Sequence, residues 1–144
     1  MKLNDFKGKK VVIMGLGLYS AGSGISATKF FAQLGANVLV TDLKTKKELA
    51  SQIKNLKGYK IKYVLGRHSR SDFKDADLII KNPAVRAESV FLRIARENRI
   101  PIETDISIFF SLCPAKIIGI TGTRGKSTTS SLIYEILKIG RAHV

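Results

Sequence analysis

Short apolar runs alternate with helical segments along most of the chain, and this alternation constrains the fold more than any other feature of the sequence. Residues 10–15 are expected to form a buried strand that ends in glycine, and residues 25–34 a helix capped by Gly35. Residues 38–42 are expected to form the next strand, so that the three segments make a right-handed βαβ unit. The pattern predicts an α/β fold in which a Rossmann-like, mostly parallel sheet is flanked by helices.

The same alternation continues as far as Pro114, where we expect the first domain to end. The later segments are expected to be helices at 45–58, 90–97 and 104–112 and strands at 59–65, 78–80 and 100–102. We therefore predict one nearly complete domain at residues 1–113. Residues 114–138 are expected to be the truncated start of a second domain, with a strand at 116–121, a glycine loop and a helix at 127–137.

Residues 139–144 interrupt the expected helical pattern and resemble a fusion scar. We expect them to be a non-native, unpacked tail.

Length, composition and cysteine usage limit the classes of protein that this chain can be. It has 144 residues, of which 44% are hydrophobic, which is enough for one core. No run approaches the roughly 20 apolar residues that span a membrane, and no signal-peptide pattern is present. The single cysteine, Cys113, is given no role and fits a reducing compartment. We therefore predict a cytoplasmic protein without a membrane partner.

The net charge of +14, from 25 Lys and Arg against 11 Asp and Glu, raises nucleic acid as a partner. The basic residues are spread along the chain, although they are densest in residues 44–74. The sequence has no basic helix with interleaved aromatic residues and no zinc-finger spacing. The charge therefore indicates a solvated, lysine-rich surface that would also attract an anionic small substrate, and we predict no nucleic-acid partner.

A glycine loop with the features of a phosphate-binding loop lies between the expected strand 116–121 and the helix that follows. Its sequence is Gly-Ile-Thr-Gly-Thr-Arg-Gly-Lys-Ser-Thr-Thr, residues 119–129. Glycines let backbone N–H groups surround phosphate oxygens, and the amino end of a helix adds partial positive charge. The strict motif has a glycine where this chain has Ile120, so the loop is a variant. The predicted ATP-binding residues are Gly122, Thr123, Arg124, Gly125, Lys126, Ser127 and Thr128.

Within that loop, three side chains have distinct expected parts. Lys126 would reach the terminal phosphates, Ser127 would offer its hydroxyl to Mg²⁺, and Thr128 is a second contact.

A second glycine-rich loop, residues 15–24, follows the first expected strand and precedes the first expected helix. Its backbone amides could hold a diphosphate. Asp42 ends the next strand and is the usual acidic partner in such a fold. It lies 27 residues after Gly15, more than the ~20 of a dinucleotide fingerprint, because the loop is longer. Alone, this loop would suggest a nicotinamide dinucleotide.

The two loops together resemble the Mur ligase superfamily. The ATP loop is similar to that of the whole superfamily, which includes folylpolyglutamate synthase. The first domain is similar to that of the D-glutamate-adding Mur ligases, whose Rossmann-like N-terminal domain binds the UDP part of the substrate with a Gly-Leu-Gly loop, a strand-ending Asp and a Ser/Asn-Pro-Gly-like turn. The matching positions are Gly15, Leu16, Gly17, Leu18, Asp42, Leu43, Asn82, Pro83 and Ala84. The resemblance implies that the loop amides contact the diphosphate and that Asp42 contacts the uracil.

Two departures from that family pattern stand in the first domain. Residues 19–24 are an extra run in the glycine loop, and Ala84 stands where glycine is common.

The activity that the resemblance implies is ATP- and Mg²⁺-dependent amide formation. The complete enzyme would phosphorylate the carboxylate of UDP-N-acetylmuramoyl-L-alanine, and the amine of D-glutamate would then attack the acyl phosphate. This is a ligase reaction of peptidoglycan synthesis, which serves cell-wall biogenesis, cell shape and cell division. Lys126 alone would have a catalytic part, and the chain by itself is expected to be inactive. Its partners would be small molecules, and we expect a monomer.

Three other functions stay open at this point. A nicotinamide-dependent dehydrogenase would use the first loop and leave the second unexplained. A nucleic-acid-binding ATPase would use the positive charge but lacks an element that reads bases. Another superfamily member would share the ATP loop and add a different amino acid.

Among the other residues, His68 is expected to be a surface or loop histidine, and Phe109 and Phe110 are expected to lie in the core.

Overall fold

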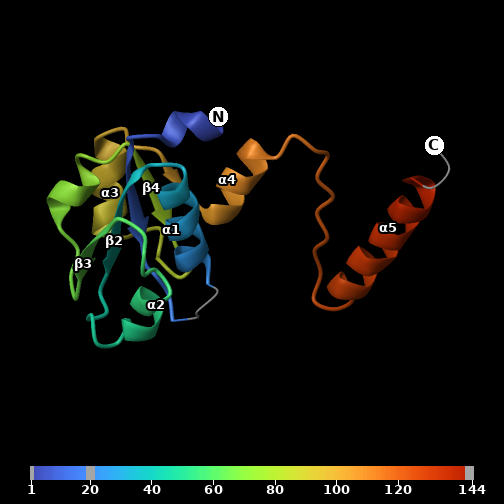
Figure 1. The fold of residues 1–144 in the computed structure, drawn as a ribbon, viewed down its shortest axis with the longest axis horizontal. Helices are drawn as coiled ribbons and strands as arrows, with labels where there is room; N and C mark the ends of the chain where they lie inside the picture. The colour runs from blue at the N-terminus through green and yellow to red at the C-terminus, as the bar shows by residue number, and fades with distance from the viewer. Residues whose placement is uncertain (1, 19–21, 142–144) are drawn as a thin grey trace. The chain divides into compact units, whose positions relative to one another are not determined.

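The chain divides into two compact units, Met1–Cys113 and Pro114–Val144, which are described separately. The structure is a computed structural model that describes residues 2–18 and 22–141. In the first unit, the described residues form one sheet of five parallel strands in the order β3-β2-β1-β4-β5 (Figure 1). The strands are β1 (Lys10–Met14), β2 (Asn37–Asp42), β3 (Ile61–Leu65), β4 (Leu78–Lys81) and β5 (Ile102–Glu103). The predicted α/β fold with a parallel sheet is confirmed.

The winding of this sheet reverses beside β1. Val11 pairs with Val38 of β2 on one side and with Leu78 of β4 on the other. The chain therefore winds outward from β1 through β2 to β3, and then returns to place β4 against the free side of β1. The carboxyl ends of β1 and β4 meet at this reversal, which is where open α/β sheets bind their ligands.

Helices cover both faces of the sheet. They are α1 (Ser23–Gln33), α2 (Ala50–Lys54), α3 (Val90–Glu97) and α4 (Asp105–Leu112), with 3-10 helices η1 (Leu3–Phe6) and η2 (Arg70–Phe73). Successive residues of a strand point to opposite faces. Val11 of β1 accordingly packs with Phe31 of α1 on one face, whereas Val12 packs with Phe73 of η2 and Leu92 of α3 on the other.

The helix expected at residues 45–58 is much shorter in the structure. Its capping pair forms, because the backbone N–H of Thr45 donates to the Glu48 carboxylate at 2.8 Å, but residues 46–49 are turns. The α-helix proper is limited to Ala50–Lys54. Buried Leu49 and Leu56 hold the segment at both of its ends. Because tertiary packing rather than local propensity stabilises so short a helix, the sequence pattern overestimated its length.

Phe109 and Phe110 of α4 are exposed, at 54% and 52%, so the prediction that they lie in the core is wrong. Ile108 is the residue of α4 that is buried, and it joins the core on the α1 face of the sheet. Each successive residue of a helix is rotated by about 100°, so that residues directly after a buried one turn away from the core. The two phenylalanine rings lie beside each other instead, with centroids 5.9 Å apart.

The second unit contains α5 (Lys126–Arg141), which is longer than expected. The helix passes through Ile139 and Gly140, so the predicted break at residue 139 is wrong. A glycine costs a helix about 1 kcal/mol, and one more residue on an existing helix adds one more hydrogen bond. Residues 142–144 of the expected tail lie outside the described residues.

Residues 116–121 do not form the strand that was expected, because a strand needs a neighbour for its backbone hydrogen bonds and no described segment pairs with this one. No helix in the described part of the chain is long and apolar enough to cross a membrane.

Candidate functional site

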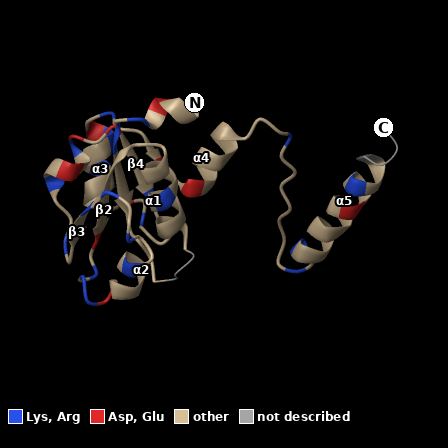
Figure 2. Ribbon diagram, viewed as in Figure 1, with Lys and Arg blue, Asp and Glu red and all other residues tan. Residues whose placement is uncertain are grey.

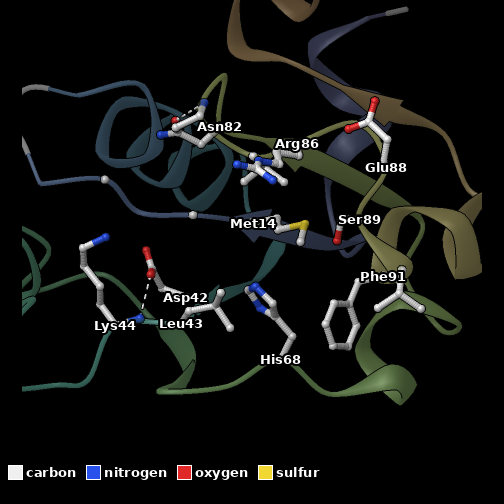
Figure 3. A pocket seen from close by; sticks show the side chains of 15 residues that line it. Met14, Asp42, Leu43, Lys44, His68, Asn82, Arg86, Glu88, Ser89 and Phe91 are labelled. Atoms are coloured by element: carbon white, nitrogen blue, oxygen red, sulfur yellow. Dashed lines mark hydrogen bonds between the residues drawn. The ribbon is translucent and has the colours of Figure 1, made fainter.

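A pocket of about 590 Å³ opens at the carboxyl ends of β1, β2 and β4, where the winding of the sheet reverses (Figure 3). Six of the nine residues predicted to bind the UDP part of a substrate line it: Gly15, Gly17, Asp42, Leu43, Asn82 and Ala84. The other three, Leu16, Leu18 and Pro83, do not line it. The pocket therefore brings together, from three strand ends, residues that are far apart in the sequence.

The glycine loop begins directly after β1 and lies close to the turn that follows β4. Gly15 and Gly17 have φ angles of +88° and +80°, which side-chain-bearing residues rarely adopt. A Cβ atom on Gly15 would lie 3.1 Å from Cβ of Asn82. Glycine at this position thus allows both the bend of the loop and its close approach to the β4 turn.

The carboxylate of Asp42 ties the end of β2 to the glycine loop. Its Oδ2 accepts a hydrogen bond from the backbone N–H of Leu16 at 2.8 Å, and its Oδ1 accepts one from Lys44 at 2.9 Å. Asp42 is only 7% exposed, and Leu16 is fully buried. The amides of Gly15 and Leu16 are therefore both engaged by the protein, and Gly17 is the next residue of the loop that lines the pocket.

Asn82 arranges the other wall of the pocket. Its side-chain oxygen accepts a hydrogen bond from the backbone N–H of Ala84 at 3.0 Å, which closes a tight turn after β4 (Figure 3). With the oxygen held in this way, the side-chain NH₂ is the group left to donate. It would lie 3.4 Å from a Cβ atom on Gly17. Asn82 can therefore donate to an anionic group held by the glycine loop.

Gly24, in the first turn of α1, is a structural part of the site that the sequence interpretation missed. A Cβ atom at this position would overlap the carbonyl oxygens of Gly15 and Leu16. In a dinucleotide-binding loop, the third glycine permits this close packing of helix against strand. The sequence did contain a signal, because glycine disfavours a helix, and a glycine in the first turn of one indicates that something packs closely against it.

His68 is a second residue that the sequence interpretation missed. It was expected to be a surface or loop histidine; it does lie in the loop after β3, half-buried, and it also lines the pocket beside Leu43 and Phe91 (Figure 3). Its Nδ1 lies 2.7 Å from the Thr41 hydroxyl, and its ring contacts Phe91 edge-on with centroids 4.9 Å apart. Burial lowers the pKa of His68 below its ordinary value, although Asp42 and Asp72 oppose the shift. Burial therefore favours the neutral form of the ring.

Positive charge also lines this pocket. Lys44 and Arg86 both belong to its wall, together with the acidic Glu88 (Figure 3). Elsewhere, Lys and Arg residues occur on several elements of the first unit (Figure 2). The two basic residues at the pocket suit a ligand with negative charge.

In the second unit, the residues predicted to bind ATP lie in the loop before α5 and in its first turn. Lys126 is the first residue of α5, and its ammonium group donates to the carbonyl oxygen of Gly122 at 2.6 Å. The backbone N–H of Thr129 donates to the carbonyl oxygen of Gly125 at 2.9 Å, which starts the helical bonding. The N–H groups of the first turn have no partner within a helix, and this makes a helix start suited to phosphate.

Comparison with known proteins shows which family the chain belongs to. Residues 9–104 match the family described as "Mur ligase MurD-like, N-terminal domain". UDP-N-acetylmuramoylalanine–D-glutamate ligase of Borreliella afzelii (strain PKo) is 43% identical over 140 residues, which cover 96% of this chain and 30% of that protein. The ligase of the same name from Roseiflexus sp. (strain RS-1) is 43% identical over 131 residues, which cover 91% of this chain and 28% of that protein.

Among solved structures, the chain is similar to a pseudomurein peptide ligase type C from Methanothermus fervidus. The TM-score is 0.58 at 29% identity, over 92% of this chain and 26% of that one. The chain thus spans less than a third of the length of these relatives. The family description matches most of the chain, and both ligases are more than 40% identical to it, which confirms the resemblance drawn from the glycine loops. The chain therefore belongs to the Mur ligase family and contains its MurD-like N-terminal domain.

Proposed function

We propose that the first unit binds the UDP part of UDP-N-acetylmuramoyl-L-alanine, and that the chain is the N-terminal part of an ATP-dependent ligase that adds D-glutamate to this substrate. The observation that carries the proposal is the pocket in which the glycine loop, Asp42 and the Asn82 turn meet at the reversal of the sheet. The names of the relatives from Borreliella and Roseiflexus support the same substrate and the same amino acid.

The diphosphate is proposed to lie against the glycine loop. Gly17 offers a backbone N–H there, and Asn82 offers its side-chain NH₂ from the opposite wall. Lys44 and Arg86 supply positive charge that offsets the charge of the phosphates. Leu16 acts indirectly in this arrangement, because its N–H holds the loop to Asp42.

The nucleoside is proposed to lie towards Asp42, Leu43 and His68. A carboxylate oxygen has two lone pairs, and each oxygen of Asp42 uses one for a backbone N–H. The remaining lone pairs can accept from a hydroxyl or ring N–H of the nucleoside. Leu43, which is 68% exposed, supplies an apolar surface for a ring.

The second unit is proposed to contribute to ATP binding. Backbone N–H groups of residues 122–128 would surround the phosphates, and Lys126 would offset charge on the phosphoryl group that is transferred. Mg²⁺, when bound with ATP at the Ser127 hydroxyl, supplies Lewis-acid stabilisation of the same charge. The acyl phosphate formed on the substrate carboxylate would carry phosphate as its leaving group, and the amine of D-glutamate would displace that phosphate. We place this reaction in the cytoplasm and expect a monomer that acts on small molecules.

Isothermal titration calorimetry with the 144-residue chain tests the proposal. UDP-N-acetylmuramoyl-L-alanine and UDP should bind with modest affinity, and binding should survive moderate salt far better than a many-phosphate contact would. NADH and duplex DNA should bind weakly or not at all. Tight binding of NADH or DNA, with no binding of either uridine ligand, would show that the proposal is wrong.

A pair of arginine variants locates the binding site. Arg86→Ala should weaken UDP binding about five- to tenfold, because a phosphate contact to a charged group is lost. Arg93→Ala removes the same charge from the exposed surface of α3 and should leave the affinity unchanged within twofold. Equal effects of the two variants would place the ligand elsewhere.

A further inference from the structure

Gln52 is a polar residue on the buried side of α2. Only 5% of it is exposed, and it lies between Leu49 and Leu56, which are fully buried in the same segment. Residues three and seven positions after Leu49 fall on one side of a helix, and this side normally carries apolar residues when it faces a core. Because a buried polar side chain needs a hydrogen-bond partner, the partner of Gln52 indicates why the residue is polar.

The carboxamide of Gln52 links α2 to the glycine loop. Its NH₂ group donates to the carbonyl oxygen of Leu18, 34 residues earlier in the chain. A carbonyl oxygen can only accept, so the nitrogen of Gln52 must face Leu18 and its oxygen must face away. That oxygen is buried, and no described residue donates to it. An unpartnered buried acceptor lowers stability, so stability alone does not account for glutamine at this position.

The bond between Gln52 and Leu18 is made outside the pocket. Gly17 lines the pocket, whereas Leu18 and Gln52 do not. Leu18 is 57% exposed, so apolar packing does little to hold it. Among the described residues, Gln52 is the one that hydrogen-bonds Leu18. The carboxamide therefore fixes the end of the loop segment that begins at Gly15.

The direction of the Leu18 carbonyl matters to a ligand with negative charge. Backbone N–H groups attract phosphate oxygens, whereas a carbonyl oxygen repels them. The N–H groups of Gly15 and Leu16 are already bonded to Thr41 and Asp42, so few loop amides are left for a ligand. A carbonyl oxygen turned into the pocket would oppose those few. With its oxygen bonded to Gln52, Leu18 directs the negative end of this dipole towards α2.

We propose that Gln52 is a positioning residue for diphosphate binding, whose NH₂ group holds the carbonyl oxygen of Leu18 out of the pocket. This inference rests on the proposed binding of a diphosphate against the glycine loop. It adds to the site a residue that touches no ligand and acts through the backbone of the loop.

Gln52→Met tests this role, because methionine has a similar length but neither donates nor leaves an unpartnered acceptor. Its free energy of unfolding in urea should be unchanged or higher. UDP affinity in calorimetry should fall about five- to tenfold, the value of one hydrogen bond. Gln33→Met is the matched control, because the Gln33 side chain donates to the Tyr59 hydroxyl at 3.1 Å on the exposed surface. This control should change UDP affinity less than twofold.

A ligand without phosphate separates positioning of the loop from a general structural role. Uridine keeps the nucleoside and lacks the diphosphate, and its weak binding can be followed by NMR titration. Gln52→Met should bind uridine within twofold of the unaltered chain. The ratio of UDP affinity to uridine affinity should therefore fall about five- to tenfold in this variant. A residue that only supported the fold would lower both affinities.

An exchange measurement on the unaltered chain does not depend on the folding of a variant. The side-chain N–H protons of Gln52 should exchange slowly with water in the ¹⁵N-labelled chain, with and without UDP, because the group is buried and bonded. Gln33, the only other glutamine of the sequence, is exposed and should exchange rapidly.

The outcomes distinguish this inference from the function on which it rests. Unchanged UDP affinity in Gln52→Met, equal losses of UDP and uridine affinity, or rapid exchange of the Gln52 protons would each overturn the role of Gln52 and leave the uridine site in place. Failure of the unaltered chain to bind UDP at all would overturn the proposed function and this inference together.

Discussion

Oδ2 of Asp42 accepts a hydrogen bond from the backbone N–H of Leu16 at 2.8 Å, and this bond joins the end of β2 to the loop that follows β1. Both residues are buried, so the bond is shielded from water. In a dinucleotide-binding fold, the acidic residue at this position is usually discussed as a contact to the ribose of the ligand. In this protein the same carboxylate also shapes the glycine loop that lines the pocket.

Asp42→Ala is therefore expected to affect both stability and binding. It leaves two backbone N–H groups without their acceptor, which should lower the free energy of unfolding by about 1–3 kcal/mol in urea denaturation. UDP and ADP should both bind more weakly, because the diphosphate loop loses its support. Asp75→Ala, which removes an exposed carboxylate, is the control and should change neither quantity. A loss confined to UDP would instead assign Asp42 to the base alone.

Gly24→Ala is expected to destabilise the first unit strongly. The added methyl group would overlap the carbonyl oxygens of two successive residues, and backbone atoms cannot rotate away as a side chain can. The free energy of unfolding should fall by more than about 2 kcal/mol, although alanine favours a helix over glycine. Ser26→Ala, at an exposed position of the same helix, should be neutral or slightly stabilising. Unchanged stability of Gly24→Ala would show that α1 does not pack against the loop as described.

Stability is expected to fall as the pH decreases below about 6.5. Burial lowers the pKa of His68 in the folded state, whereas the unfolded chain keeps the ordinary value. Between the two values the unfolded state binds more protons, so acidification favours unfolding, and the full stability is present only above the unfolded pKa. Carboxyl groups titrate mainly below pH 5 and contribute little in this window.

The difference in melting temperature between pH 7.5 and pH 5.5 measures this effect. It should be larger for the unaltered chain than for His68→Gln, which has no group to protonate at this position. The same difference in both proteins would show that His68 is equally protonated in the folded and unfolded states.

Lys126→Ala is expected to separate the two nucleotide sites. In a protein that carries the complete ATP domain, ATP affinity should fall at least tenfold, because the variant lacks the ammonium group that is proposed to contact the phosphates at the start of α5. UDP affinity should change less than twofold, because the pocket lies within the first unit, Met1–Cys113. Calorimetry with each nucleotide measures both. A comparable loss of the two affinities in a folded variant would contradict the assignment of two independent sites.

The fold could be predicted from the sequence where local pattern decides the structure. The expected strand at 38–42 and the expected helix at 90–97 agree with β2 and α3 to within one residue, because a short buried apolar run and helical spacing are patterns of neighbouring residues. The exposure of Phe109 could not be predicted in this way. Which side of α4 is buried depends on where α1 lies, and no local pattern contains that information.

The residues of the candidate site also fall into two groups, those that local sequence pattern specifies and those that it does not. Gly15, Asp42 and Asn82 were found because a motif specifies them by their order after strands, and all three line the pocket. His68 and Arg86 belong to no motif. They reach the same pocket because β3 and β4 lie on opposite sides of the β2–β1 pair, so that their carboxyl ends face the same opening. That proximity is a property of strand order and could not be obtained from spacing.

The packing of Gly24 against the glycine loop has a consequence for how this loop can evolve. Three contacts hold the loop, and they lie on either side of residues 19–21. The backbone N–H of Leu16 donates to Asp42, and the side chain of Gln52 donates to the carbonyl oxygen of Leu18. Gly24 packs closely against the carbonyl oxygens of the loop. Insertions or deletions between Leu18 and Gly22 need not displace the amide of Gly17, because the fixed points lie outside the altered stretch. Homologues can therefore differ in the number of residues here and still hold the same phosphate group. In a genome search, a pattern that demands one glycine spacing would discard them.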